Sequence, residues 1–235
     1  MPITDSIVYL TLLLAGVWSY SSGKLTMAGS ITGAVTGLVI FKGAGLSCFL
    51  MLTSFFVLGS AATKWKRDKK AVMNATDAHQ GRRTAAQVVA NSGVAVLLSL
   101  YALWKPDELI IIQLMIAGSF AAATADTLSS ELGTVYGKRF YNVISFNKET
   151  AGLDGVVSLE GTLIGIVGAF IITAVNSFFS GWSNLLCIVI GGFTGNLVDS
   201  ILGATLERNG LMGNNVVNFL NTVVGAVVCW ACNYI

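Results

Sequence analysis

The feature that most constrains this chain is a series of long apolar segments separated by short polar ones. A helix needs about 20 apolar residues to cross the hydrocarbon layer of a bilayer. Seven or eight segments approach that length, at residues 7–22, 25–41, 46–63, 84–104, 108–126, 156–179, 185–206 and 216–234. With 54% hydrophobic and 11% charged residues, the chain falls outside the range of soluble proteins. The apolar runs are continuous rather than alternating, which argues against a membrane β-barrel.

These segments predict an all-α fold, a polytopic transmembrane helix bundle of seven or eight spans forming a single domain over residues 1–235. The 26 glycines favour close helix packing, because small residues let helix backbones approach each other in lipid. Two longer polar loops, at about 64–83 and 133–155, are expected to emerge on one side and to contain short interfacial helices. We leave open whether the bundle forms a homo-oligomer.

The positions of the charges predict the orientation of the bundle. Twelve of the 14 Lys and Arg residues fall on the side of the two long loops, and only Lys42 and Lys105 fall opposite. The positive-inside rule therefore predicts an integral membrane protein whose long loops and active site face the cytoplasm. The net charge of only +2 gives no reason to expect a nucleic-acid partner.

Polar residues recur at helical spacing in the half of each span that lies near these loops. They are Thr84, Gln87 and Asn91 in the fourth span, Asp126 in the fifth, Asn196, Asp199 and Glu207 in the seventh, and Asn214, Asn215, Asn218 and Asn221 in the eighth. Such side chains are costly in a membrane and normally face a bundle interior or a water-filled cavity. We therefore expect one shared polar pocket facing the cytoplasm. The alternative is that the amides only bond helices to one another.

Asp126 and Asp199 fit that alternative poorly, because a carboxylate inside a span needs a cation or a proton. Carboxylates at matching ends of two helices are better explained by a shared cation, and Mg²⁺ prefers a few carboxylates together with phosphate oxygens. Glu131, in the continuation of the fifth span, is a further candidate ligand. The sequence thus predicts a metal site of Asp126, Glu131 and Asp199.

Candidate phosphate contacts surround this pocket. A glycine-rich turn before the sixth span places Gly155, Ser158, Glu160, Gly161 and Thr162 at a helix N-terminus, where free N–H groups suit a phosphate. The same small residues also suit plain helix packing. Four basic residues border the acidic and amide stripes, and their cationic groups can hold phosphate: Arg82, Arg83, Lys138 and Arg139.

At these residues the chain resembles the phytyl-phosphate kinase family, which includes the eukaryotic transmembrane protein 19. The segments that carry the resemblance are 81–91, 125–133, 155–165, 195–204 and 214–218, which follow one another along most of the chain. More distantly, 126–140 and 158–162 are similar to the nucleotide-site strings of dolichol kinase and related CTP-dependent polyprenol kinases. Residues 145–150 depart from the family, since they lack the proline-rich sequence of many members.

The resemblance implies a kinase that transfers the terminal phosphate of a nucleoside triphosphate, CTP or another, to a membrane isoprenoid monophosphate such as phytyl, farnesyl or geranylgeranyl phosphate. Under this hypothesis Asp126 and Asp199 hold Mg²⁺, with Glu131 or Glu160 as a further ligand or positioning group. Arg82, Arg83, Lys138 and Arg139 would neutralise the charge on the transferred phosphoryl group. The amides of Gln87, Asn91 and the seventh and eighth spans would orient acceptor or nucleotide.

Two other functions remain open from the sequence. A small-solute or ion transporter would also place carboxylates along a pathway through the bundle. Against it, the halves of the spans away from the long loops contain almost nothing ionisable, whereas transport needs access from both sides. The second alternative is a noncatalytic lipid-binding or scaffold protein, which would not respond to nucleotide at all.

Overall fold

The computed structural model of the protein describes residues 3–66, 70 and 81–234. Its helices are α1 (Ile3–Ser21), α2 (Met27–Ala44), α3 (Leu46–Lys64), α5 (Ala85–Trp104), α6 (Leu109–Tyr136), α7 (Leu159–Ser180), α8 (Leu185–Leu202) and α9 (Asn214–Cys232). A 3₁₀ turn (η1, Pro106–Glu108) precedes α6, and a π-helical turn (η2, Gly203–Glu207) continues α8. Two short strands, β1 (Tyr141–Asn142) and β2 (Val156–Val157), pair antiparallel between α6 and α7.

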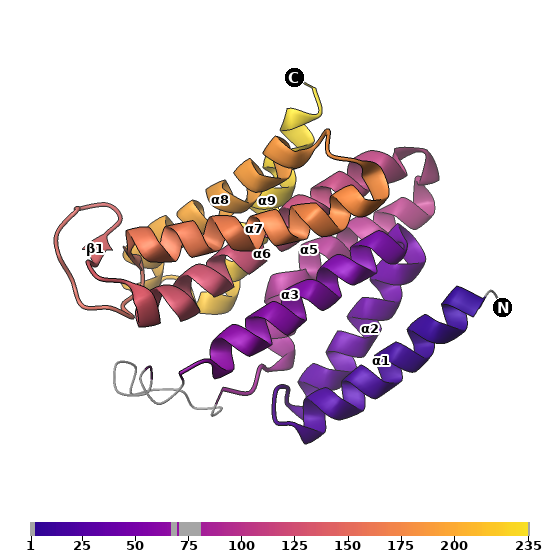
Figure 1. The fold of residues 1–235 in the computed structure, drawn as a ribbon, viewed down its shortest axis with the longest axis horizontal. Helices are drawn as coiled ribbons and strands as arrows, with labels where there is room; N and C mark the ends of the chain where they lie inside the picture. Colours follow the sequence, from indigo (N-terminus) through magenta and orange to yellow (C-terminus); the bar gives the residue numbers. More distant parts are fainter. Residues whose placement is uncertain (1–2, 67–69, 71–80, 235) are drawn as a thin grey trace.

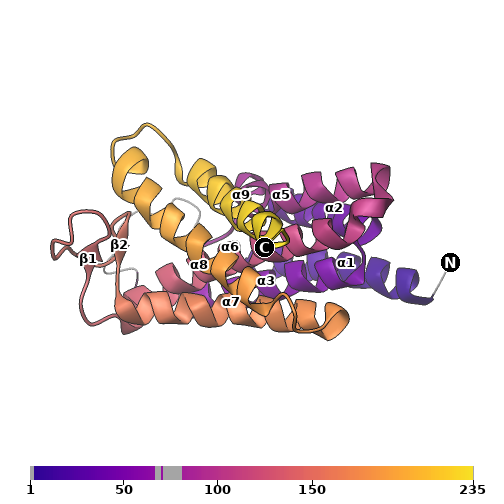
Figure 2. The same ribbon diagram turned by 90° about the horizontal axis from the view of Figure 1, so that it is seen from above.

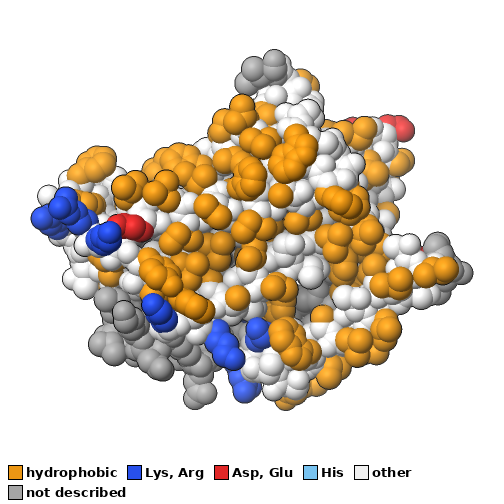
Figure 3. All heavy atoms as spheres, viewed as in Figure 1, with side chains coloured by type: hydrophobic (Ala, Val, Ile, Leu, Met, Phe, Trp, Pro, Cys, Tyr) orange, Lys and Arg blue, Asp and Glu red, His pale blue; other side chains and the backbone are white. Residues whose placement is uncertain are grey.

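All eight α-helices of the described residues are long and apolar enough to cross a membrane. The expected transmembrane helix bundle is therefore confirmed, with eight spans where the sequence left a choice of seven or eight. Large apolar side chains cover the outside of the bundle, such as Ile110 at 81% and Phe178 at 85% exposure. Figure 3 shows this apolar surface, with Lys and Arg side chains gathered toward one end of the molecule. That distribution is the one a bilayer requires.

Helix α6 is the centre of the bundle and packs against α3, α5, α7, α8 and α9 (Figures 1 and 2). Its middle is rich in alanine, and Ala117, Ala121, Ala122, Ala123 and Ala125 have no exposed surface. Small side chains allow the neighbouring helix backbones to come close. At the N-terminal side, α1 packs mainly on α2, and only its Val8 and Ser19 are buried.

The loop after α6 differs from the sequence expectation in two ways. Helix α6 continues to Tyr136, ten residues past the predicted end of the span at Asp126, so the loop starts later than 133. The polar side chains of this extension do not stop the helix, because they face a cavity or bond within the helix, as Thr134 Oγ1 does to Ser130 O at 2.7 Å. In place of the expected short helix, the loop contains the β1–β2 pair.

The expected loop at 64–83 lies largely outside the described residues. Helix α3 ends at Lys64, and between Lys66 and Gly81 the structure describes Lys70 alone. The end of the bundle that carries the β1–β2 loop is where α6 ends and α7 begins, and the N-terminus lies at the far end (Figure 1).

Candidate active site

The structure brings together the two acidic residues that the sequence placed in separate spans. Asp126 on α6 and Asp199 on α8 line the same cavity, and their carboxyl groups lie close enough to interact with each other. A third helix joins them, because Asn221 Nδ2 on α9 donates to Asp199 Oδ2 at 3.3 Å. The Asn221 side chain has no exposed surface, so it fixes the orientation of the Asp199 carboxylate from inside the bundle.

This carboxylate pair lies in the wall of a cavity of about 770 Å³ at the end of the bundle with the β1–β2 loop. We call it the first cavity. Helices α6, α7 and α8, the turn η2 and the loop between α6 and α7 enclose it. Nine of the residues selected from the sequence line it: Asp126, Glu131, Gly155, Ser158, Gly161, Thr162, Asn196, Asp199 and Asn214. Its size is in the range of small-molecule and cofactor sites.

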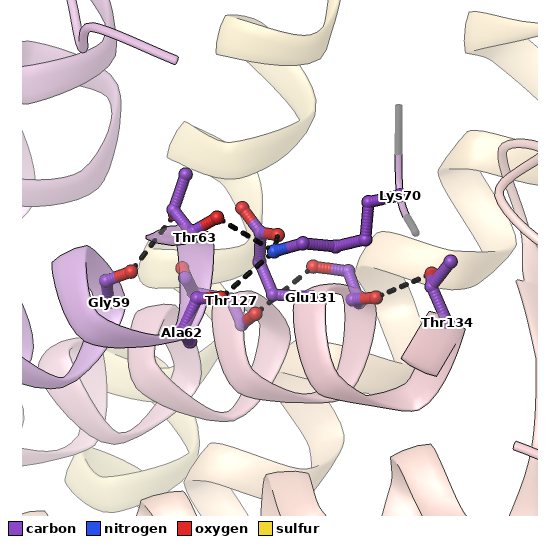
Figure 4. Close-up of polar contacts among 8 residues, drawn as sticks. Gly59, Ala62, Thr63, Lys70, Thr127, Glu131 and Thr134 are labelled. Carbon is purple, nitrogen blue, oxygen red and sulfur yellow. Dashed lines mark hydrogen bonds and ion pairs between the residues drawn. The ribbon is translucent and has the colours of Figure 1, made fainter. Parts of the chain in front are cut away.

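Glu131 makes an ion pair inside the first cavity. Lys70 Nζ contacts Glu131 Oε2 at 2.6 Å and also donates to the backbone oxygens of Ala62 and Thr63 at 2.9 and 2.8 Å. Figure 4 shows the Lys70 side chain reaching from outside α6 to meet Glu131 beside the end of α3. This ion pair links the end of α3 to α6. It also engages the carboxylate of Glu131, which the sequence suggested as a third metal ligand.

The N-terminus of α7 closes one side of the first cavity. Ser158 caps this helix, because its Oγ accepts a hydrogen bond from Gly161 N at 3.1 Å. Gly161 is required at the crossing of α6 and α7, since an added Cβ would lie 2.9 Å from Ser129 O. Both expectations for this segment are therefore compatible with the structure: the glycine packs helices together, and the first turn still faces the cavity.

A bond between α6 and α8 supports the same wall. Ser129 Oγ donates to Asn196 Oδ1 at 3.0 Å, one helical turn from the carboxylate pair on each helix. Asn196 is buried at 7% exposure, so this contact holds the two helices in register where Asp126 and Asp199 meet. The π-helical turn η2 follows directly and turns Glu207 into the cavity. Such π-bulges occur frequently at functional sites.

The loop that covers the first cavity is fastened to the end of α8. Arg208 Nη2 binds Glu149 Oε2, and Arg208 Nε donates to Asp154 O, both at 2.6 Å. Asn142 Nδ2 donates to the other oxygen of Glu149 at 3.1 Å. The hydrogen bond from Arg208, the nearby positive charge and the Asn142 bond lower the pKa of Glu149. Gly155, with a φ of +69°, lets this loop pass against the backbone of η2.

Several residues selected from the sequence do not line the first cavity. The basic residues Arg82, Lys138 and Arg139 are exposed, and Arg83 lines a neighbouring cavity. Burial lowers the pKa of the Arg83 guanidinium, while the negative charges of Glu131 and Asp126 act in the opposite direction. Glu160 accepts a hydrogen bond from Lys138 N at 3.3 Å, which fastens the chain just after α6.

The amides of the fourth span also have structural partners. Gln87 closes a capping box with Thr84 at the start of α5, where Thr84 N donates to Gln87 Oε1 at 2.8 Å. Asn91 Nδ2 donates to Gln87 O at 2.9 Å. On α9, Asn218 Nδ2 donates to Asn214 Oδ1 at 2.8 Å, and Asn215 is exposed. These contacts lie within single helices, so they do not provide the bonds between helices that the alternative predicted, and only Asn214 of this group lines the first cavity.

The structure adds cavity residues that the sequence selection missed. They are Lys70, Ser129, Asp154 and Ser200. Spacing had already put Glu207 and Asn221 on the polar faces of the seventh and eighth spans; Glu207 lines the cavity, and Asn221 bonds Asp199 from behind it. Lys70 gave no such signal, because nothing in a run of basic residues distinguishes the one that turns inward.

The charges of the first cavity favour a bound cation. Among the described residues that line it, five are acidic, namely Asp126, Glu131, Asp154, Asp199 and Glu207, and Lys70 alone is basic. Across the part of the chain that the structure describes, no three His, Cys, Asp or Glu side chains are grouped as a ready metal site. Two adjoining carboxylates with open space beside them fit Mg²⁺, which takes few protein ligands and completes its shell with phosphate oxygens and water.

Comparisons with known proteins extend these observations. The family described as integral membrane protein DUF92 matches residues 10–226. The uncharacterized membrane protein MJ0933 of Methanocaldococcus jannaschii is 32% identical over 201 residues, which cover 85% of this chain and 82% of that protein. The chloroplastic protein VTE6 of Arabidopsis thaliana is 31% identical over 212 residues, 87% of this chain but only 64% of VTE6. Protein PGR of Arabidopsis thaliana is 31% identical over 82% of this chain and 75% of its own length. No solved structure matches the chain.

Proposed function

We propose, from the premise that this chain belongs to the DUF92 family of integral membrane proteins, that it is a membrane phosphotransferase. This membership confirms the family resemblance that the motifs predicted. The proposed reaction transfers the terminal phosphate of a nucleoside triphosphate, CTP in our assignment, to an isoprenoid monophosphate in the membrane. The product is the isoprenoid diphosphate, and the reaction requires Mg²⁺.

The observation that carries this proposal is the meeting of Asp126 and Asp199 in the wall of a cavity at one end of the bundle. Two carboxylates on different spans cannot remain side by side and charged without a cation. The cavity beside them is large enough for phosphate groups and is edged by the first turn of α7. Such a site suits a nucleotide that arrives from water and an acceptor that stays in the lipid.

Asp126 and Asp199 would hold the Mg²⁺ ion, which supplies positive charge to the terminal phosphates of the nucleotide. Asn221 orients the Asp199 carboxylate, and the Ser129–Asn196 bond keeps α6 and α8 in register around the pair. The N–H groups of the first turn of α7 and the ammonium of Lys70 would contact further phosphate oxygens. Asn196 and Asn214 lie in the cavity wall, where they can orient bound groups.

The chemistry balances without a protein base. An oxygen of the acceptor monophosphate forms a bond to the terminal phosphorus of the nucleotide, and the bond from that phosphorus to the bridging oxygen breaks. The nucleoside diphosphate leaves with the electron pair. The attacking oxygen is already anionic, so catalysis consists of positioning and charge stabilisation. Removal of one such electrostatic contact typically costs about 10²–10³ in rate.

We assign the first cavity to the cytoplasmic side. The support is the charge distribution, since ten of the 12 Lys and Arg residues that the structure describes belong to loops and helix ends at the cavity end. Nucleoside triphosphates are cytoplasmic metabolites, so this orientation also gives the proposed donor access to the site.

A direct assay tests the proposed function. Detergent-purified protein is incubated with CTP or ATP, Mg²⁺ and a panel of phytyl, farnesyl and geranylgeranyl monophosphates, and lipid diphosphates are detected by mass spectrometry. We expect Mg²⁺-dependent product from the wild type and from Asp107→Asn, a control at the opposite end of the bundle, but not from Asp199→Asn. Absence of any lipid diphosphate with every nucleotide, from protein that remains folded, would refute the proposal.

A further inference from the structure

A second cavity, of about 400 Å³, adjoins the first one. It lies where the turn between α1 and α2, the end of α3 and the segment before α5 come together. Two backbone bonds build this junction: Thr26 N donates to Arg83 O at 3.0 Å, and Arg83 N donates to Lys24 O at 2.9 Å. The described lining residues are Trp18, Ser22, Gly23, Lys24, Ser60, Thr63, Lys64, Gly81 and Arg83.

The described lining of the second cavity is opposite in charge to that of the first. Its described lining contains three cations, Lys24, Lys64 and Arg83, and no acidic residue. Ser22, Ser60 and Thr63 add three hydroxyl groups. The ion pairs between described residues involve other cations, so these pairs do not neutralise the cavity. Three positive charges and several hydroxyl donors are what a dianionic phosphate monoester requires.

Aromatic rings hold two of these cations in place without neutralising them. Lys24 Nζ lies 4.6 Å from the centre of the Trp18 ring, and the Arg83 guanidinium carbon lies 5.4 Å from that of Phe55. Arg83 also fills the space beside Gly59, where an added Cβ would lie 2.6 Å from Nη2. The cationic groups are therefore positioned before any ligand arrives, which lowers the entropic cost of binding.

The two cavities share a border. Thr63 and Gly81 line both of them, and the charges of Asp126 and Glu131 in the first cavity act on Arg83 in the second. A phosphate bound in the basic cavity would thus lie next to a metal-bound nucleotide in the acidic one. Phosphoryl transfer from one bound phosphate to another requires this proximity.

The position of the second cavity beside α1 favours a lipid as the source of the phosphate. Trp18 is 52% exposed, and the face of α1 leading to it carries Leu10, Leu14 and Val17 at 57–61% exposure. These side chains face the bilayer, and a tryptophan near the end of a span is typical of the headgroup level. A ligand with its phosphate in the cavity can therefore lay an apolar chain along α1.

We infer that the second cavity is the acceptor site: Lys24, Lys64 and Arg83 bind the phosphate of a membrane isoprenoid monophosphate, beside the nucleotide in the first cavity. This inference rests on the proposed function for the identity of the lipid, and it assigns the two anionic substrates to separate, oppositely charged cavities. Thr63 lies at the border across which the phosphoryl group passes.

The test measures binding, without nucleotide or Mg²⁺, so that it does not depend on turnover. Farnesyl monophosphate, farnesol, inorganic phosphate and phosphatidic acid are titrated against the full-length protein in detergent. The double variant Lys24→Gln/Lys64→Gln is compared with Lys66→Gln/Lys148→Gln, which removes the same charge from exposed positions at the same end that line neither cavity. We expect Kd for farnesyl monophosphate to rise about tenfold in the first pair only. The single variant Lys64→Gln, at an exposed position, should raise the Kd for farnesyl monophosphate about threefold.

Other outcomes decide against the inference or against the proposed function separately. An unchanged Kd in Lys24→Gln/Lys64→Gln, or an equal change in the control pair, would overturn the acceptor site. Equal affinity for phosphatidic acid would overturn the assignment to an isoprenoid, and equal affinity for inorganic phosphate would overturn the assignment to a lipid. If farnesyl monophosphate binds through Lys24 and Lys64 but no nucleotide ever phosphorylates it, the acceptor site stands and the kinase proposal fails.

Discussion

Replacing Asp199 by Asn should make the metal-free protein more stable while it removes activity. In the absence of a cation, the contact between Asp126 and Asp199 brings two like charges together inside the bundle. Two unit charges at a separation of about 4 Å repel by about 4 kcal/mol at an effective dielectric constant near 20. Since the cavity admits water and a proton can relieve the repulsion, we expect a gain of about 1–2 kcal/mol on substitution.

The asparagine keeps the shape of the side chain and an oxygen that can accept the 3.3 Å bond from Asn221. A gain of that size corresponds to a rise of roughly 2–8 °C in Tm for a chain of this length. Magnesium should stabilise the wild type more than the variant. At about 100 times its Kd, Mg²⁺ stabilises the wild type by about 2.7 kcal/mol, but the variant hardly at all. The two proteins should therefore exchange their order of stability when Mg²⁺ replaces EDTA.

The assay is thermal unfolding in detergent with EDTA and over a series of Mg²⁺ concentrations, alongside the diphosphate assay. Asp107→Asn serves as the control, because it removes a carboxylate from the exposed turn η1 at the other end of the bundle. Our reasoning is refuted if metal-free Asp199→Asn is less stable than the wild type, if Mg²⁺ stabilises both proteins equally, or if the variant keeps wild-type turnover.

Three further substitutions probe the surroundings of the first cavity. Lys70→Gln leaves the cavity without its described cation, so the KM for nucleotide should rise about tenfold; an unchanged KM in folded protein would remove Lys70 from the site. Arg208→Met should speed hydrogen exchange in the β1–β2 loop. In the wild type, exchange in this loop should speed up only as the pH falls through the lowered pKa of Glu149, because the ion pair between Arg208 and Glu149 is intact above that pH. Gly161→Ala should cost about 1–3 kcal/mol of unfolding free energy at the α6–α7 crossing, whereas Gly16→Ala, with open space around it, should cost almost nothing; similar losses in the two would contradict the packing argument.

The sequence predicted the parts of this fold that depend on local composition. Eight apolar segments correspond to eight helices, because the hydrocarbon layer imposes one length on every span. The meeting of Asp126 and Asp199 was also predictable, since each lies in the same half of its span and a buried carboxylate must find a partner. Local rules failed where helix α6 continued past Asp126 into polar residues, because its cavity-facing side needed no apolar side chains.

The positions of the Lys and Arg side chains could not be predicted from their proximity to the acidic motifs along the sequence. Arg82, Lys138 and Arg139 border the acidic motifs along the chain but stay exposed, whereas Lys70 reaches the first cavity. Arg83 goes to a different cavity because its backbone pairs with the turn between α1 and α2, a contact between distant segments. Spacing along one helix says which residues share a face, but it does not say which loop residue turns toward that face.

A final prediction separates the kinase from the transporter. A solute entering the first cavity would have to continue along α6 past Asp126, where the bundle is filled by side chains without exposed surface, including Ile116 and Phe120. The Phe120 ring stacks on Phe55 of α3 with centres 6.2 Å apart, and both belong to one continuous apolar cluster. Transport would require this packed layer to part in every cycle, whereas phosphoryl transfer leaves it closed.

Purified protein in liposomes loaded with a Mg²⁺- or pH-sensitive dye should therefore show no flux in the absence of nucleotide, although an added ionophore produces a full signal. Flux that disappears in Asp126→Asn would mean that the carboxylate pair lines a pathway, and the assignment of the first cavity to a nucleotide would be wrong.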